Sequence, residues 1–210
     1  SNFTELRIVN MGVISNGTTL LDAGALDSGI ATGDMILLST ATASSSATID
    51  ITSGISSTYK QYVFKYISIH PATDGESFTF QTDTGTNTSY NQTVTSTFFQ
   101  VIHGENDGNA ELSYNTGNDH AQQSSFQIIT ELASSDADHG ISGTLHLFDP
   151  SNATFVKHFN TNSQYTDANN KSMNTYAAGY FNTTTALTRV RFKMSSGNID
   201  SGTIKMYGIK

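Results

Sequence analysis

The sequence predicts an all-β protein, an antiparallel sandwich of two β-sheets with a jelly-roll-like arrangement. Runs of alternating or continuous apolar residues recur along the 210 residues, and clusters of Gly, Asn, Asp and Ser separate them. Almost no segment has the i, i+3, i+4 apolar spacing of an amphipathic helix. A long series of strands joined by polar turns is typical of a two-sheet sandwich.

The expected strands follow one another from the N-terminus with a polar turn after each. They cover residues 5–14, 35–40, 47–52, 59–70, 77–82, 96–103, 110–114, 124–133, 143–149, 154–159, 187–194 and 202–209. Two further segments, 25–31 and 167–181, each have an Asp near their start and are expected to be short helices.

The segment YKQYVFKYISIH predicts a central strand because both of its faces are largely apolar. One face carries Tyr62, Phe64 and Tyr66, and the other carries Val63, Lys65, Ile67 and Ile69.

The segment GTIKMYGI is expected to be an integral strand of the sandwich, with the chain ending where this strand ends. Ile204, Met206 and Gly208 share the face that should point into the core. The residues NIDS, between Gly197 and Gly202, predict a loop that joins this strand to 187–194 as a hairpin.

We expect one domain over residues 1–210, within which residues 1–45 are the candidate for an attachment or extended segment. The chain has no Cys, so stability must come from packing and backbone pairing rather than disulfides. No run approaches the roughly 20 apolar residues of a membrane helix, so no membrane insertion is expected. The net charge of −8 argues against nucleic acid as a partner.

Charge is distributed unevenly along the chain. Residues 1–156 carry 3 basic and 16 acidic side chains, whereas residues 157–210 carry 7 basic and 2 acidic ones. The segment TRVRFKM places Arg189, Arg191 and Lys193 on one face of a strand. This basic stripe is interpreted as a solvated face, as an assembly contact with the acidic part of a neighbouring subunit, or as a site for an anionic ligand.

No catalytic constellation or cofactor motif stands out, and none of the six His residues is spaced like a zinc hydrolase motif. The densest group of oxygen ligands is Glu105, Asp107, Asn109 and Asp119, a segment interpreted first as a polar hairpin and only weakly as a candidate site for calcium.

Tyrosines in polar contexts are candidates for stacking on a sugar ring. Tyr90, Tyr114 and Tyr165 have this setting, although such residues also anchor loops.

Two stretches resemble virion structural proteins of tailed bacteriophages, in a group common in marine phages and described as fibre-like or decoration-like. They are SGISSTYKQYVFKYISIHPATDGESFTFQTDTG, residues 53–85, and SGNIDSGTIKMYGIK, residues 196–210; residues 9–29 look similar to the start of such proteins. The resemblance implies a β-sandwich that is displayed on a virion, is made in the bacterial cytoplasm and assembles with itself or with other virion proteins.

Three functions follow as hypotheses. The first is a non-enzymatic virion surface protein, either a capsid decoration or a fibre or appendage subunit. The second is a receptor-binding or carbohydrate-binding domain of a tail fibre that recognises a glycan on the host surface. The third is a polysaccharide-degrading enzyme, which the absence of a recognisable catalytic motif disfavours.

Overall fold

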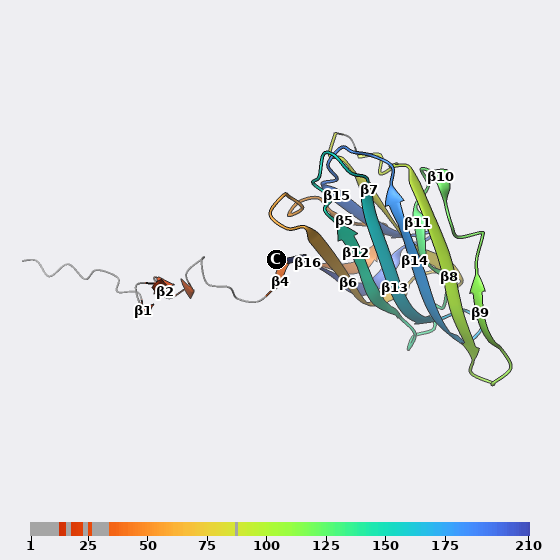
Figure 1. Ribbon diagram of the computed structural model, residues 1–210. Coiled ribbons are helices and arrows are strands. Elements are labelled where there is room, and N and C mark those ends of the chain that lie inside the picture. The colour runs from red at the N-terminus through yellow and green to blue at the C-terminus, as the bar shows by residue number, and fades with distance from the viewer. Residues whose placement is uncertain (1–12, 16–17, 23–24, 27–33, 87) are drawn as a thin grey trace, which may run out of the picture. The chain divides into compact units, whose positions relative to one another are not determined.

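The computed structural model describes residues 13–15, 18–22, 25–26, 34–86 and 88–210 (Figure 1). The chain divides into two compact units, Ser1–Asp34 and Met35–Lys210. The strand β4 begins at Met35, so the residues that follow Asp34 in the candidate attachment segment 1–45 belong to the second unit.

The first unit contains a small antiparallel sheet in the order β1-β2-β3. Its strands are β1 (Val13–Ser15), β2 (Thr18–Asp22) and β3 (Ala25–Leu26). The helix expected over 25–31 is wrong at its start, which is β3, and its remainder lies outside the described residues. Of the strand expected over 5–14, only the last two residues are described, and both belong to β1.

The second unit is built from thirteen strands, and no helix occurs in its described residues. The strands are β4 (Met35–Ser46), β5 (Ile49–Ile51), β6 (Gln61–Pro71), β7 (Glu76–Asp83), β8 (Val94–Gly104), β9 (Ala110–Tyr114), β10 (Ala121–Gln123), β11 (Gln127–Ala133), β12 (Ile141–Phe148), β13 (Lys157–Thr166), β14 (Lys171–Phe181), β15 (Arg189–Met194) and β16 (Ile199–Ile209).

These strands form two sheets, which pack face to face as an antiparallel β-sandwich and confirm the predicted fold class (Figure 1). The larger sheet has nine strands in the order β10-β8-β14-β13-β12-β6-β16-β4, and β9 pairs with β8 beside β10. The smaller sheet has four strands in the order β11-β7-β15-β5.

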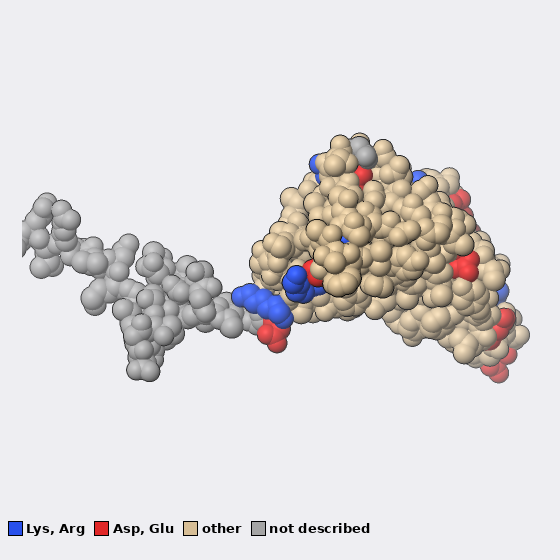
Figure 2. Space-filling model, turned by 45° about the horizontal axis from the view of Figure 1, so that its top comes forward, with Lys and Arg blue, Asp and Glu red and all other residues tan. Residues whose placement is uncertain are grey.

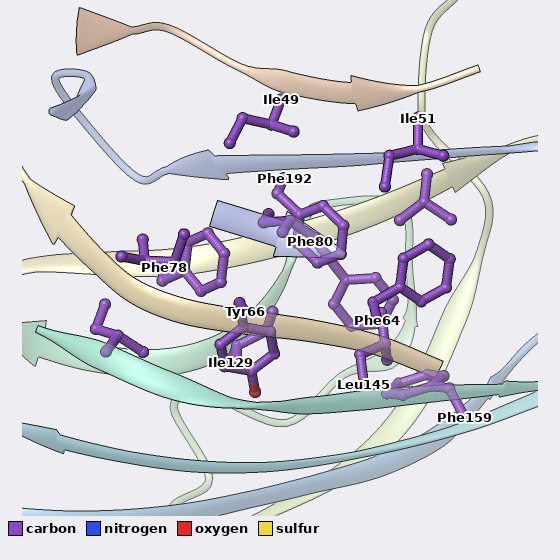
Figure 3. Packing of buried hydrophobic residues seen from close by; sticks show 14 of the residues in the cluster. Ile49, Ile51, Phe64, Tyr66, Phe78, Phe80, Ile129, Leu145, Phe159 and Phe192 are labelled. Atoms are coloured by element: carbon purple, nitrogen blue, oxygen red, sulfur yellow. The ribbon is translucent and has the colours of Figure 1, made fainter. Parts of the chain in front are cut away.

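The core between the two sheets is rich in aromatic rings that meet across the sandwich (Figure 3). Tyr66 of β6 lies edge-on to Phe78 of β7, with 5.4 Å between ring centroids. Phe80 of β7 lies edge-on to Phe159 of β13 at 5.1 Å, and within the smaller sheet Phe192 of β15 stacks on Phe78 at 5.7 Å. Since these rings are at most 2% exposed, their burial provides much of the driving force for folding.

β6 is a central strand, as predicted, because it pairs with β12 on one side and with β16 on the other. The predicted division of its faces is wrong at Ile69, which is fully buried, whereas Ile67 is 45% exposed. The register shifts between Tyr66 and Ile69, and Ser68 has a φ of +50°. This β-bulge turns Ile69 onto the inner face.

The helix expected over 167–181 is wrong, because this segment contains β14. β14 lies between β13 and β8 in the larger sheet. Its buried residues alternate with less buried ones, with Met173, Thr175 and Ala177 facing inward. The period of two therefore prevails over the helix-forming tendency of the Ala and Lys residues.

The C-terminal strand β16 confirms the predicted core face, since Ile204, Met206 and Gly208 are buried. The predicted hairpin with 187–194 is wrong, because β15 lies in the smaller sheet and β16 in the larger one. The short connection after Met194 therefore crosses from one sheet to the other, and β16 inserts between β4 and β6.

Candidate functional site

The outer face of the larger sheet carries a cluster of apolar side chains near the edge formed by β9, all of them exposed except Tyr176, which is half-buried. We call it the aromatic patch, and it consists of Phe99, Val101, Leu112, Tyr114 and Tyr176. β8 alternates strictly between buried and exposed residues, so Phe99 and Val101 point away from the core. The register places Phe99 opposite both Tyr114 and Tyr176, and Val101 opposite Leu112, which brings all five to the same face.

The aromatic patch is ordered by contacts among its own rings and at its rim. The rings of Phe99 and Tyr176 stack with 4.7 Å between centroids and an interplanar angle of 12°. The Tyr114 hydroxyl donates a 2.5 Å hydrogen bond to a carboxylate oxygen of Asp119, which raises the pKa of Tyr114. Leu112 is 70% exposed and Tyr114 is 51% exposed, so a pre-formed apolar surface faces the solvent.

Of the three tyrosines considered for sugar stacking, only Tyr114 is exposed. Tyr90 is 2% exposed, and the Arg191 guanidinium lies 4.1 Å above its ring. Tyr165 is also 2% exposed, and its hydroxyl accepts a hydrogen bond from the Glu131 amide. Burial raises the pKa of both residues. The predictions for Tyr90 and Tyr165 are wrong, because neither ring has a free face on the surface.

The basic stripe lies on the outer face of the smaller sheet, as the alternation of Arg189, Arg191 and Lys193 predicts. Arg191 forms a two-pronged ion pair with Asp50 of β5, with nitrogen–oxygen distances of 2.7 and 2.5 Å. This pairing raises the pKa of Arg191. At this position an acidic partner, Asp50, belongs to the same chain, and the assembly contact of the basic stripe stays a prediction.

The calcium candidates do not converge on one site. Glu105, Asp107 and Asn109 lie in the turn between β8 and β9, whereas Asp119 lies beyond the other end of β9. A five-residue strand separates these positions by roughly 17 Å. Among the described residues, no group of three or more His, Asp or Glu side chains is placed to hold a metal ion.

Sequence reasoning missed Phe99 and Tyr176 as surface residues. The period-two alternation of 96–103 signals that Phe98 and Phe99 face opposite sides, but it does not say which side is the core. Tyr176 lay in the segment expected to be a helix.

Charged side chains are sparse over the face seen in Figure 2 and lie towards its margins. No helix in the described part of the chain is long and apolar enough to span a membrane. No protein-family model, curated protein or solved structure matches the chain.

Proposed function

We propose that this protein is a non-enzymatic surface protein of a tailed-phage virion, as a capsid decoration or a fibre or appendage subunit. In this proposal the sandwich Met35–Lys210 is the displayed head, and copies contact one another through the aromatic patch. The exposed aromatic patch is the observation that carries the proposal.

The occupant of the aromatic patch is a second copy of the same chain. The net charge of −8 makes whole copies repel one another, but the five side chains of the patch carry no charge. Two patches can therefore meet across a twofold axis without like charges at the centre of the contact, while the Asp119 carboxylate stays at the rim, hydrogen-bonded to Tyr114. Asn162 and Asn174 lie on the same face next to Tyr176 and Val101 and supply a polar rim. An aromatic centre with a polar rim is typical of specific protein interfaces.

Two further observations support the virion setting. The stretches 53–85 and 196–210 resemble virion proteins of tailed phages. The division into Ser1–Asp34 and Met35–Lys210 also fits a chain with an N-terminal attachment segment and a displayed head. Antibodies raised against the sandwich should label purified phage particles in electron micrographs. Label confined to lysate protein that is free of particles would contradict the virion location.

Sedimentation velocity tests the contact. The apparent mass should rise above the 22.6 kDa of one copy as the protein concentration increases. The double variant Phe99→Ser, Leu112→Ser should keep the mass of one copy at all concentrations. Phe155→Ser is the matched control, since Phe155 is 67% exposed and lies outside the patch. A wild-type protein that stays a monomer at all concentrations, or a double variant that associates like the wild type, would refute the contact.

A further inference from the structure

A second feature lies outside the smaller sheet and adjoins the aromatic patch at Asp119, which is hydrogen-bonded to Tyr114. Residues 116–128, which connect β9 to β11 and continue into it, border an open pocket of about 540 Å³ together with Thr79 of β7 and Lys193 of β15. Its lining includes Asp119, His120, Ser125, Phe126, Ile128 and Lys193. We call it the His120 pocket. Its volume lies within the range of pockets that bind small molecules.

The imidazole of His120 has an unused hydrogen-bonding position. His120 is 7% exposed, and burial lowers its pKa, so the ring is neutral near pH 7. Nε2 lies 3.3 Å from the Ser125 hydroxyl, which in turn donates to the Gln123 side-chain oxygen at 3.4 Å. When Ser125 gives its one proton to Gln123, its oxygen accepts from Nε2 and Nδ1 is the unprotonated nitrogen. Nδ1 is buried and has no partner among the described residues.

Lys193 and Asp119 add a donor and an acceptor to the same pocket. The Lys193 ammonium lies 4.7 Å from the Phe126 ring centroid and makes no ion pair with any described residue. The Asp119 carboxylate accepts one hydrogen bond, from Tyr114, and has further lone pairs available. Phe126 and Ile128 provide apolar surface beside these polar groups.

We propose that the His120 pocket binds one sugar residue of a glycan. A pyranose ring presents hydroxyls that donate and accept beside patches of apolar C–H surface. The hydroxyls match the Lys193 donor and the Asp119 acceptor, and the C–H surface matches Phe126 and Ile128. A wholly apolar ligand would cover the Lys193 ammonium without giving it a partner, which is unfavourable. A small inorganic anion would use Lys193 but not the apolar surface of Phe126 and Ile128.

The pocket contains a cation, so both neutral and acidic sugars fit the same chemistry. Binding should be measured by titration calorimetry and saturation-transfer NMR with D-glucose, D-galactose, N-acetyl-D-glucosamine and D-galacturonate. At least one probe should bind with a dissociation constant of about 1 mM, as expected for one sugar ring held by a few hydrogen bonds. If D-galacturonate binds more tightly than the neutral sugars and Lys193→Ala abolishes this difference, the ligand is an acidic sugar. If the neutral sugars bind as tightly as D-galacturonate, the ligand is a neutral sugar.

Two variants and a matched control test the location. Lys193→Ala and Phe126→Ala should each weaken binding about tenfold or more, which corresponds to one charge-assisted hydrogen bond or one apolar contact. Lys65→Ala is the control, because the Lys65 ammonium also lies over a ring, that of Tyr207 at 5.4 Å, on the outer face of the larger sheet. The ¹⁵N shift of His120 Nδ1 should move when the sugar binds.

The proposal is wrong if no probe binds the wild-type chain, or if Lys193→Ala and Phe126→Ala, with unchanged thermal transitions, bind as well as Lys65→Ala. Both variants lie outside the aromatic patch, so they leave the association of copies unchanged. Loss of sugar binding and loss of association are therefore distinguishable.

Discussion

Replacing Phe80 with Ala should remove the central ring of the core. Phe80 is fully buried, and its ring lies 5.1 Å from that of Phe159, 5.9 Å from that of Phe181 and 6.3 Å from that of Phe192. Phe→Ala at a site that cannot collapse lowers the free energy of unfolding by about 3–5 kcal/mol. We expect the upper half of that range, since the neighbouring rings are held by strands of both sheets and cannot close the cavity.

Urea denaturation followed by circular dichroism measures this loss by linear extrapolation. A loss of that size is a large part of the about 5–15 kcal/mol that stabilises a typical domain. Phe155→Ala is the control: this ring is 67% exposed, so the change should stay within about 0.5 kcal/mol. If Phe80→Ala lowers the free energy of unfolding by less than about 1 kcal/mol, and the slope of that free energy against urea concentration is unchanged, the core is not organised around this ring.

Two other outcomes follow from the structure. Burial lowers the pKa of His120 more than Asp119 raises it, so the unfolded chain binds a proton more readily. Stability should therefore fall as pH drops from about 6.5, and His120→Gln should flatten this slope; an unchanged slope in urea titrations would contradict the assignment. Deleting Thr203–Lys210 removes most of β16 and should yield insoluble or unfolded protein, whereas deleting only Lys210, which lies beyond β16, should be harmless. A soluble Thr203–Lys210 deletion with the wild-type thermal transition would mean that β16 is dispensable for the sandwich.

Period-two patterns predicted most of the sandwich strands, because a half-buried strand must alternate between core and solvent. The same rule shows why β14 was missed: its inward positions hold Thr175 and Ala177, which are too small or too polar to stand out. β13 extends past its predicted end through NTNSQY, where Thr161 and Ser163 face inward. Small and polar residues that face inward hide a strand from hydrophobic patterning.

The sites were harder to predict than the fold because they depend on which strands become neighbours. Phe99 and Tyr176 stack only because β8 pairs with β14, and no spacing in the sequence encodes that pairing. The His120 pocket likewise joins residues 116–128 to Lys193 through the packing of a loop on a sheet. In contrast, the basic stripe and the buried residues Val190 and Phe192 lie on opposite faces of a single strand, β15. Alternation along one strand was enough to predict this separation.

The position of β16 between β4 and β6 also governs when the larger sheet can be completed during synthesis. β4 leaves the ribosome first, and residues 47–198 must follow before β16 can pair with it. Until then, β6 and the twelve-residue β4, which has no charged residue and no Pro, each present an unpaired edge. Such edges invite pairing with other chains, and distant pairings form slowly. We therefore expect the nascent chain to depend on chaperones, and slower growth at low temperature to raise the soluble yield.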